Sequence, residues 1–174
     1  MRIETSDTLA DLARDNIDVA IRSSPTGSWP GLEAHFLLRE TFTPMLSPVL
    51  LASIGGVTEP ADLLRLPIIG ATDDWWRIWF EKAGVDAAEN LATRPASRFG
   101  SQAYEGRAAT AGLGVGILTP GMFVQELASG SLIQPFDLVG EDDHSYWLVN
   151  EAGRRNVPKI RAFREWLLKE MGRA

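Results

Sequence analysis

The stretch DLARDNIDVAIR, residues 11–22, decides the fold class. Apolar residues recur at helical spacing over positions 9–13, and Ser6 or Asp7 can cap a helix that starts there. After Asn16 the apolar residues alternate along the chain, which predicts a short strand over 17–22 that is buried on at least one face. A helix that leads directly into a strand is half of an α/β unit, so the sequence predicts an α/β protein.

Polar side chains follow the end of this predicted strand. Arg22 and Ser23 come directly before Ser24-Pro25. In open α/β sheets, ligands collect at the carboxyl ends of strands, so both residues are candidate ligand contacts. Arg22 can bind a carboxylate through two parallel hydrogen bonds. A salt bridge from Arg22 to a nearby Asp or Glu is the open alternative.

The composition is that of an ordinary globular protein. The chain has 174 residues, 45% of them apolar and 23% charged, which is enough for one domain or for two small lobes. The absence of cysteine excludes a disulfide scaffold and a thiolate metal site. A net charge of −6 argues against binding to a phosphate backbone by this chain alone. No apolar run reaches about 18 residues and the N-terminus lacks a signal-peptide core, so we expect a cytoplasmic protein without a membrane span.

Further elements follow from periodicity, caps and breakers. A long strand over 34–47 contains Pro44, which must lie at an edge or a bend, and this strand is a plausible crossing between lobes. Helices are predicted over 48–53, 60–66, 74–82, 101–110, 119–129 and 156–171. Strands are predicted over 67–70, 96–99, 115–118, 132–136 and 145–149, with a polar connection over 86–93 and an acidic loop over 140–144.

The helix over 74–82 carries Trp75, Trp76, Trp79 and Phe80. These aromatic side chains could form a platform for a ligand. Since Trp76, Trp79 and Phe80 recur at helical spacing, we favour the alternative that they pack the helix onto a sheet.

The stretch GSQAYEGRAATAGLGVGILTP, residues 100–120, contains several glycines. A dinucleotide fingerprint requires strand, glycines and helix in that order, whereas these glycines separate a helix from a strand. The more useful feature is the start of the helix at Gly100, Ser101 and Gln102, where free N–H groups and the helix dipole favour a carboxylate. An ordinary helix cap explains the same residues.

No catalytic or metal-binding motif is evident. His35 and His144 lack a partner at metal-ligand spacing, so we interpret both as structural or surface residues. The pairs Asp73-Asp74 and 142–143 suit caps and loops, and neither a G-x-S-x-G motif nor a P-loop occurs. We therefore expect no enzyme activity, no cofactor and no metal ion.

Several motifs resemble one known family along the whole chain. They are Asp11-Leu12-Ala13, Ile17-Asp18-Val19-Ala20-Ile21-Arg22, Trp29-Pro30-Gly31-Leu32, and Glu126-Leu127, Gly130, Leu132-Ile133 and Pro135-Phe136. This set resembles the effector-binding domain of LysR-type transcriptional regulators, and within that family Trp29-Pro30-Gly31-Leu32 and FREWL at 163–167 resemble glycine-cleavage regulators.

The resemblance implies a type 2 periplasmic-binding-protein-like fold, with two Rossmann-like lobes joined by two crossover strands. Lobe I would comprise residues 1–41 and 148–174, and lobe II residues 42–147. In this family a winged helix-turn-helix, a linker helix and one more strand and helix precede the segment, so the chain resembles an N-terminally truncated effector domain.

The implied function is the sensing of a small anionic effector in a cleft between the lobes, coupled to DNA binding through the missing N-terminal domain. The residues expected at the effector are Arg22, Ser23, Thr41, Gly100, Ser101, Gln102 and Thr119. The resemblance also implies a homodimer, weakened by the truncation. The alternative is a type 2 solute-binding protein or a small enzyme of the same fold. A signal peptide would favour transport and a catalytic His or Cys near Arg22 would favour an enzyme; neither is seen.

Overall fold

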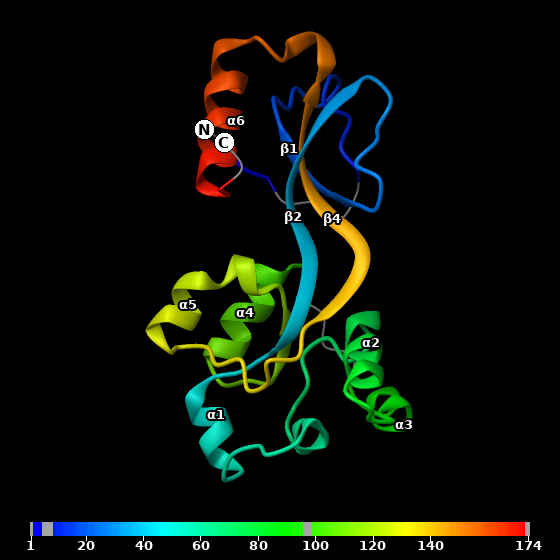
Figure 1. Ribbon diagram of the computed structural model, residues 1–174, viewed down its shortest axis with the longest axis vertical. Coiled ribbons are helices and arrows are strands. Elements are labelled where there is room, and N and C mark those ends of the chain that lie inside the picture. The colour runs from blue at the N-terminus through cyan, green and yellow to red at the C-terminus, as the bar shows by residue number, and fades with distance from the viewer. Residues whose placement is uncertain (1, 5–8, 96–98, 173–174) are drawn as a thin grey trace. The chain divides into compact units, whose positions relative to one another are not determined.

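The computed structural model describes residues 2–4, 9–95 and 99–172 of the chain. It has a mixed α/β fold that divides into two compact units (Figure 1). Unit 1 comprises Met1–Glu40 and Asp142–Ala174, and unit 2 comprises Thr41–Glu141. The chain passes from one unit to the other within two strands, β2 (Leu32–Met45) and β4 (Gly140–Glu151). The second passage therefore lies earlier in the chain than the boundary after Trp147 that the sequence suggested.

Unit 1 is built on antiparallel strands. β1 (Ala20–Ser24) pairs with β4, so that Ala20 lies opposite Val149. β4 is also the neighbour of β2 in the strand order β1-β4-β2-β3. A short 3₁₀ turn, η3 (Ala152–Arg154), and the helix α6 (Pro158–Glu170) complete the unit, with α6 beside the strands in Figure 1. The buried apolar side chains are Leu12, Leu37, Leu148, Val149 and Ile160.

The predicted helix over 9–13 is absent, and this prediction was wrong. The chain instead makes a tight turn, in which Asp15 N–H donates to Asp11 O and Ile17 N–H donates to Leu12 O, both at 2.9 Å. Asn16 has a φ of 55°, a left-handed conformation that asparagine tolerates better than most residues and that ends any helical run. The strand begins at Ala20, and none of its five residues is buried, with Ile21 56% exposed, so the prediction of a buried face was also wrong. The predicted caps Ser6 and Asp7 lie outside the described residues.

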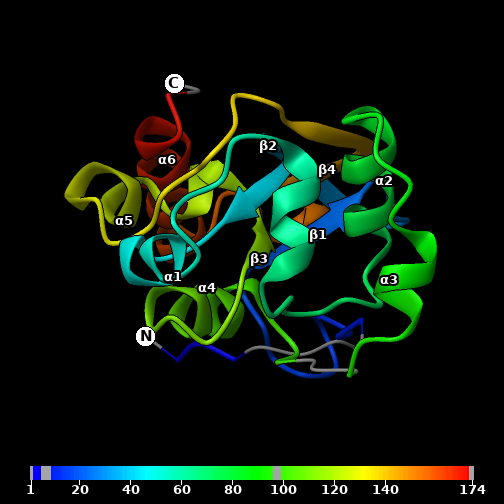
Figure 2. The same cartoon turned by 90° about the horizontal axis from the view of Figure 1, so that it is seen from below.

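Unit 2 is mainly helical around the short strand β3 (Gly116–Leu118), as the view from below shows (Figure 2). β3 pairs antiparallel with the end of β2. The remaining elements are α1 (Pro48–Ser53), η1 (Pro60–Arg65), α2 (Asp74–Lys82), α3 (Ala88–Ala92), α4 (Gln102–Thr110), η2 (Pro120–Met122) and α5 (Val124–Ser129).

Five predictions for this part of the chain were wrong. The polar connection over 86–93 contains α3, and the single helix over 119–129 is divided into η2 and α5 by Phe123. The predicted strands over 67–70 and 132–136 form only isolated bridges, from Ile68 to Val115 and from Ile133 to Leu46. The predicted acidic loop over 140–144 is the first part of β4. Of the strand predicted over 96–99, residues 96–98 lie outside the described part.

The aromatic residues of α2 pack the core, as predicted. Trp76 and Trp79 are fully buried and Phe80 nearly so. The indole N–H of Trp76 donates to Ile69 O at 2.9 Å, and that of Trp79 donates to Leu138 O at 2.9 Å. Leu138 O also accepts from the hydroxyl of Thr43 at 2.9 Å, so this carbonyl has two donors. The tryptophan helix is therefore a structural element, and no ligand platform is needed to explain it.

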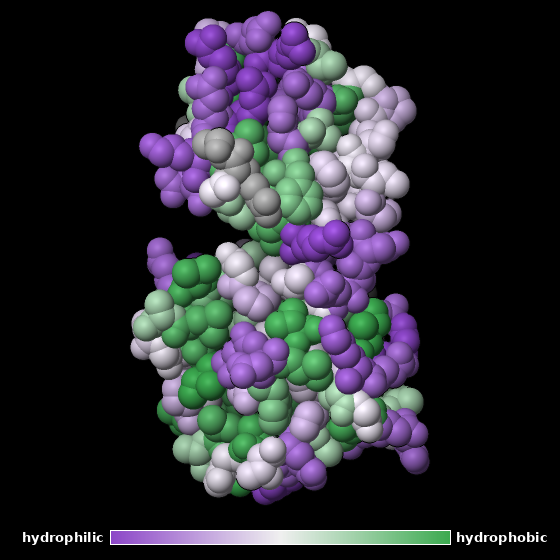
Figure 3. Space-filling model, in the orientation of Figure 1, coloured by the Kyte–Doolittle hydropathy of each residue, from purple (hydrophilic) through white to green (hydrophobic). Residues whose placement is uncertain are grey.

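Large apolar side chains also reach the surface of unit 2. The most exposed of them are Val49, Tyr104, Leu113, Met122 and Val124. In Figure 3 the visible face of this unit carries more hydrophobic residues than that of unit 1. None of the helices in the described ranges is long and apolar enough to cross a membrane.

Candidate functional site

The start of α4 is joined to the end of β3 by one side chain. Ser101 is the N-cap residue of α4, and Gln102 is its first residue. The side-chain oxygen of Gln102 accepts from the backbone N–H of Thr119 at 2.8 Å, and its amide nitrogen lies 3.2 Å from the hydroxyl of Thr119. Thr119 is fully buried and directly follows β3. The structure thus brings together the predicted residues Gln102 and Thr119 at a strand end and a helix N-terminus, a place where α/β folds bind anions.

Two further predicted residues lie at this helix end. The hydroxyl of Ser101 makes no capping hydrogen bond to the helix. Gly100 is exposed with a φ of 73°, and a Cβ at this position would meet no atom within 4 Å. The side chain of the N-cap residue therefore does not occupy the first N–H groups of α4.

Arg22 is engaged within unit 1. Its guanidinium donates to the carbonyl oxygen of Ala10 and lies 5.7 Å from the centre of the Trp29 ring. This arrangement is neither of the two that the sequence suggested, an effector carboxylate or a salt bridge. An effector that binds Arg22 would share the guanidinium with the Ala10 carbonyl and the Trp29 ring. Thr41, the first residue of unit 2, is half-buried in β2.

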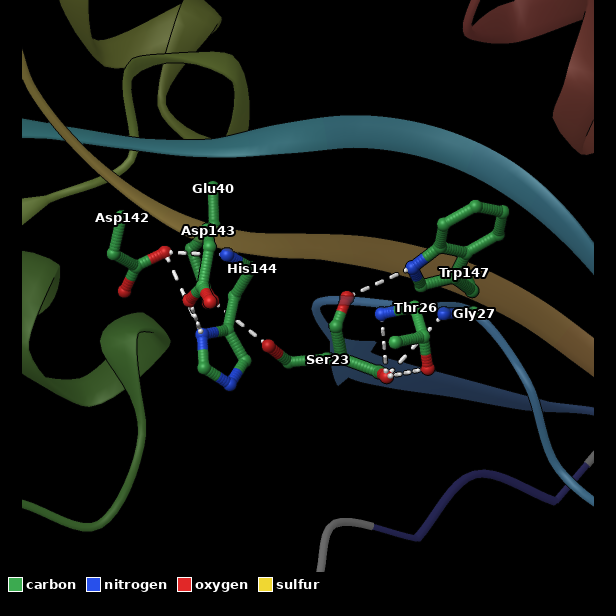
Figure 4. A network of polar contacts seen from close by, with 9 residues as sticks. Ser23, Thr26, Gly27, Glu40, Asp142, Asp143, His144 and Trp147 are labelled. Carbon is green, nitrogen blue, oxygen red and sulfur yellow. Dashed lines mark hydrogen bonds and ion pairs between the residues drawn. The ribbon is translucent and has the colours of Figure 1, made fainter.

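Ser23 leads to a polar cluster that the sequence did not reveal (Figure 4). Its hydroxyl donates to Oε2 of Glu40 at 2.8 Å. Glu40 in turn lies with Asp142 and His144 in a group whose carboxylate oxygens and imidazole nitrogen are within 4.8 Å of one another. Nδ1 of His144 is 3.1 Å from Oδ1 of Asp143 and 3.7 Å from Oδ1 of Asp142. The sequence predicted His144 to be a structural or surface residue. It did not predict this cluster, because Glu40 lies far from His144 in the sequence, in β2.

The other histidine lies elsewhere in unit 1. His35 has its Nε2 atom 3.6 Å from Oε1 of Glu33, on the same strand. Burial lowers the pKa of His35, and the negative charge of Glu33 only partly opposes this shift. In the part of the chain that the structure describes, no third metal-ligating residue lies close enough to His35 and Glu33 to form a metal site with them.

Two compact units, connected through two strands, define a bilobal α/β fold. The family model of the LysR substrate binding domain matches residues 1–172. The chain belongs to this family.

Proteins of known function are similar along almost the whole chain. The HTH-type transcriptional activator AmpR of Enterobacter cloacae is 33% identical over 172 residues, covering 98% of this chain and 57% of that protein. The glycine cleavage system transcriptional activator of Escherichia coli K12 is 30% identical, covering 97% of this chain and 54% of that protein. This chain thus spans little more than half the length of these curated relatives.

A solved structure confirms the fold class. The effector domain of the transcriptional regulator AmpR of Pseudomonas aeruginosa superposes with a TM-score of 0.76 at 31% sequence identity, covering 98% of this chain and 80% of that one. The predicted LysR effector-domain fold is therefore confirmed, and the relatives are transcriptional regulators rather than enzymes.

Proposed function

We propose that this chain is the effector-sensing part of a LysR-type transcriptional regulator. The observation that carries the proposal is the likeness to the AmpR effector domain of Pseudomonas aeruginosa, which extends over 98% of the chain. The ligand is a small anion, DNA is bound through an N-terminal winged helix-turn-helix domain, and the protein acts in the cytoplasm as a homodimer. The exposed apolar side chains of unit 2 support self-association.

The start of α4 supports the choice of an anionic ligand. A helix N-terminus presents unsatisfied N–H groups and the positive end of the helix dipole. Ser101 leaves its hydroxyl outside the helix cap, and Gln102 holds the helix start against Thr119. A carboxylate bound here would accept hydrogen bonds from groups that are fixed in position before it arrives, which lowers the entropic cost of binding.

Effector binding would act on the regulator by shifting its equilibrium between conformations. A ligand changes such an equilibrium only by its difference in affinity for the two states. The two strand connections, β2 and β4, are the segments through which a change in one unit reaches the other along the chain. Arg22 and Ser23 lie in β1, the neighbour of β4, and Thr41 lies in β2, so we propose all three as additional effector contacts.

Thermal unfolding in the presence of a panel of free amino acids and small carboxylates tests the proposal. A ligand at 100 times its dissociation constant adds about 2.7 kcal/mol to the free energy of unfolding, which is readily seen as a rise in Tm. Ser101→Ala should reduce this rise while leaving the Tm without ligand nearly unchanged, since the hydroxyl makes no capping bond.

Ser129→Ala at the exposed end of α5 is the control. It loses the hydrogen bond from Ser129 to Glu126 O, so its Tm without ligand can fall slightly, but it should keep the full rise with ligand. Equal rises in both variants would contradict the assignment of the α4 start. No rise with any member of the panel, in this chain and again in the full-length regulator, would contradict an anionic amino-acid or carboxylate effector.

A further inference from the structure

We propose that Glu40, Asp142 and His144 form a binding site for a divalent transition-metal ion, with Zn²⁺ as the ion that fits the donors. Each residue offers one ligand atom, and the three atoms lie within 4.8 Å of one another. Glu40 comes from β2, and Asp142 and His144 come from β4, the neighbouring strand of the sheet. Figure 4 shows the three side chains gathered beside Ser23.

The first argument is the burial of Glu40. Only 6% of this residue is exposed, and its carboxylate accepts one hydrogen bond, from the neutral hydroxyl of Ser23. Across residues 2–4, 9–95 and 99–172, Glu40 forms no ion pair with a lysine or an arginine. A largely buried carboxylate gains from a nearby positive charge, and Ser23 is a neutral donor. Oε1 of Glu40 is the carboxylate oxygen that Ser23 leaves open to a cation.

The second argument is independent and concerns His144. Its Nδ1 atom is buried and makes no hydrogen bond of acceptable geometry, although Oδ1 of Asp143 lies 3.1 Å away. Such a nitrogen has a lone pair or a proton without a proper partner, and leaving it buried has a cost. Coordination to a metal ion would use the lone pair, while Asp143 would add negative charge next to the site.

The donor set favours zinc over the common hard cations. Zn²⁺ binds imidazole nitrogen and carboxylate oxygen at about 2.0–2.2 Å, and three protein ligands commonly leave a fourth position for water. Tetrahedral coordination at these lengths places ligand atoms about 3.4 Å apart. The three ligand atoms lie within 4.8 Å of one another, and rotation of the His144 side chain, which is 43% exposed, can bring them to the tetrahedral separation. Mg²⁺ and Ca²⁺ prefer all-oxygen sites, so the imidazole discriminates against them.

The surrounding contacts would orient two of the ligands. Ser23 donates to Oε2 of Glu40 at 2.8 Å, which leaves Oε1 for the ion. The backbone N–H of His144 donates to Oδ1 of Asp142, also at 2.8 Å. Hydrogen bonds of this kind fix metal ligands in position and raise affinity.

The position in the chain gives the site a mechanical consequence. Unit 1 ends after Glu40 and resumes at Asp142, so both strand connections leave unit 1 directly at a proposed ligand. A bound ion would tie β2 to β4 at these two points. The site lies wholly within unit 1 and binds its ion without an effector, although Ser23, which donates to Glu40, is also one of the effector contacts proposed above.

Calorimetric titration of the metal-free chain with ZnCl₂ is the test. We expect one Zn²⁺ per chain, and visible absorption of tetrahedral Co²⁺ when CoCl₂ replaces it. Loss of an outer-shell partner costs about 10- to 100-fold in affinity, so Glu40→Gln and His144→Gln should each raise the Kd for Zn²⁺ by at least as much. His35→Gln is the matched control and should leave the Kd unchanged. It removes the second histidine of the chain, which lies in β2 and outside the proposed site.

The stability of the same variants provides a second readout. Glu40→Gln removes a buried charge and keeps an acceptor for Ser23, so without metal its Tm should equal or exceed that of the wild type. Addition of Zn²⁺ should raise the Tm of the wild type and of His35→Gln but not that of Glu40→Gln. Absence of Zn²⁺ binding by the wild type, equal losses in His35→Gln and His144→Gln, or equal affinity for Mg²⁺ would each overturn the proposal.

Discussion

Gly106→Ala is a change for which two known effects have opposite signs. Gly106 lies inside α4, the helix whose first turn we propose to bind the effector. In an open helix, alanine in place of glycine stabilises by about 0.8–1.0 kcal/mol, because glycine has the greater conformational freedom to lose. At this position, however, an added Cβ would lie 2.1 Å from Cε1 and 2.6 Å from Cζ of Phe123.

The clash should outweigh the gain in helix propensity. Phe123 is only 6% exposed and packs in a cluster with Met45, Ile69, Ala108, Ala109, Leu118 and Leu132, so its ring cannot move without displacing neighbours. Overpacking of a core typically costs about 1–3 kcal/mol. With a contact as close as this one, we expect the upper part of that range and a net destabilisation of about 1–2 kcal/mol.

Urea unfolding followed by tryptophan fluorescence measures the effect, since Trp76 and Trp79 are buried in the same unit. A double-mutant cycle with Phe123→Leu isolates the clash. In the leucine background the added methyl group gains room, so Gly106→Ala should cost little or even stabilise. If Gly106→Ala stabilises the wild type as much as it stabilises the Phe123→Leu variant, the packing argument is wrong.

Two further predictions concern the core and the acid stability. Trp76→Phe should destabilise more than Trp79→Phe in urea unfolding. Trp76→Phe removes the indole donor to Ile69 O, and an unsatisfied buried carbonyl costs about 1–3 kcal/mol. In Trp79→Phe, Leu138 O keeps its hydrogen bond from Thr43. The pKa of Asp18 lies below its usual value, chiefly because of the hydrogen bond from Lys159. The ionised carboxylate of Asp18 therefore contributes stability above about pH 4, and this contribution is lost as the pH falls through the lowered pKa. Asp18→Asn should therefore reduce stability at neutral pH and flatten its fall in acid, measured as urea midpoints at about pH 6 and pH 3; a fall as steep as in the wild type would contradict this.

The helices that the sequence predicted well have their signals within a few residues. Pro48 occupies the first position of α1, after Ser47, whose hydroxyl accepts from the N–H of Leu50 at 3.2 Å. Asp73 caps α2 by accepting from Trp75 N–H at 2.9 Å. Caps and a proline at the first helical position act through the local backbone, so they can be recognised without knowledge of the tertiary structure.

Two of the errors arose where distant segments decide the local structure. The acidic residues at the start of β4 have low strand propensity, and they form a strand because β2 lies beside them in the sheet. At the strand predicted over 132–136, only Ile133 pairs, with Leu46. Propensity is a weak guide in both cases because the competing term is a tertiary contact. The error near the N-terminus is local, because Asn16 adopts a left-handed conformation and hydrogen bonds within residues 11–17 make a turn in place of the predicted helix.

The same reasoning explains which parts of the candidate site could be predicted. Gln102 and Thr119 were recognisable because a helix start and a strand end each have local signals. Glu40 and His144 were not, since a search for metal ligands by sequence spacing cannot find residues that meet only through adjacent strands. One signal was nevertheless present: Glu40 is a charged residue in the middle of a long strand that becomes buried. Folded proteins rarely bury a carboxylate without a use for it, so a residue that departs from the local pattern in this way marks a place where function is to be sought.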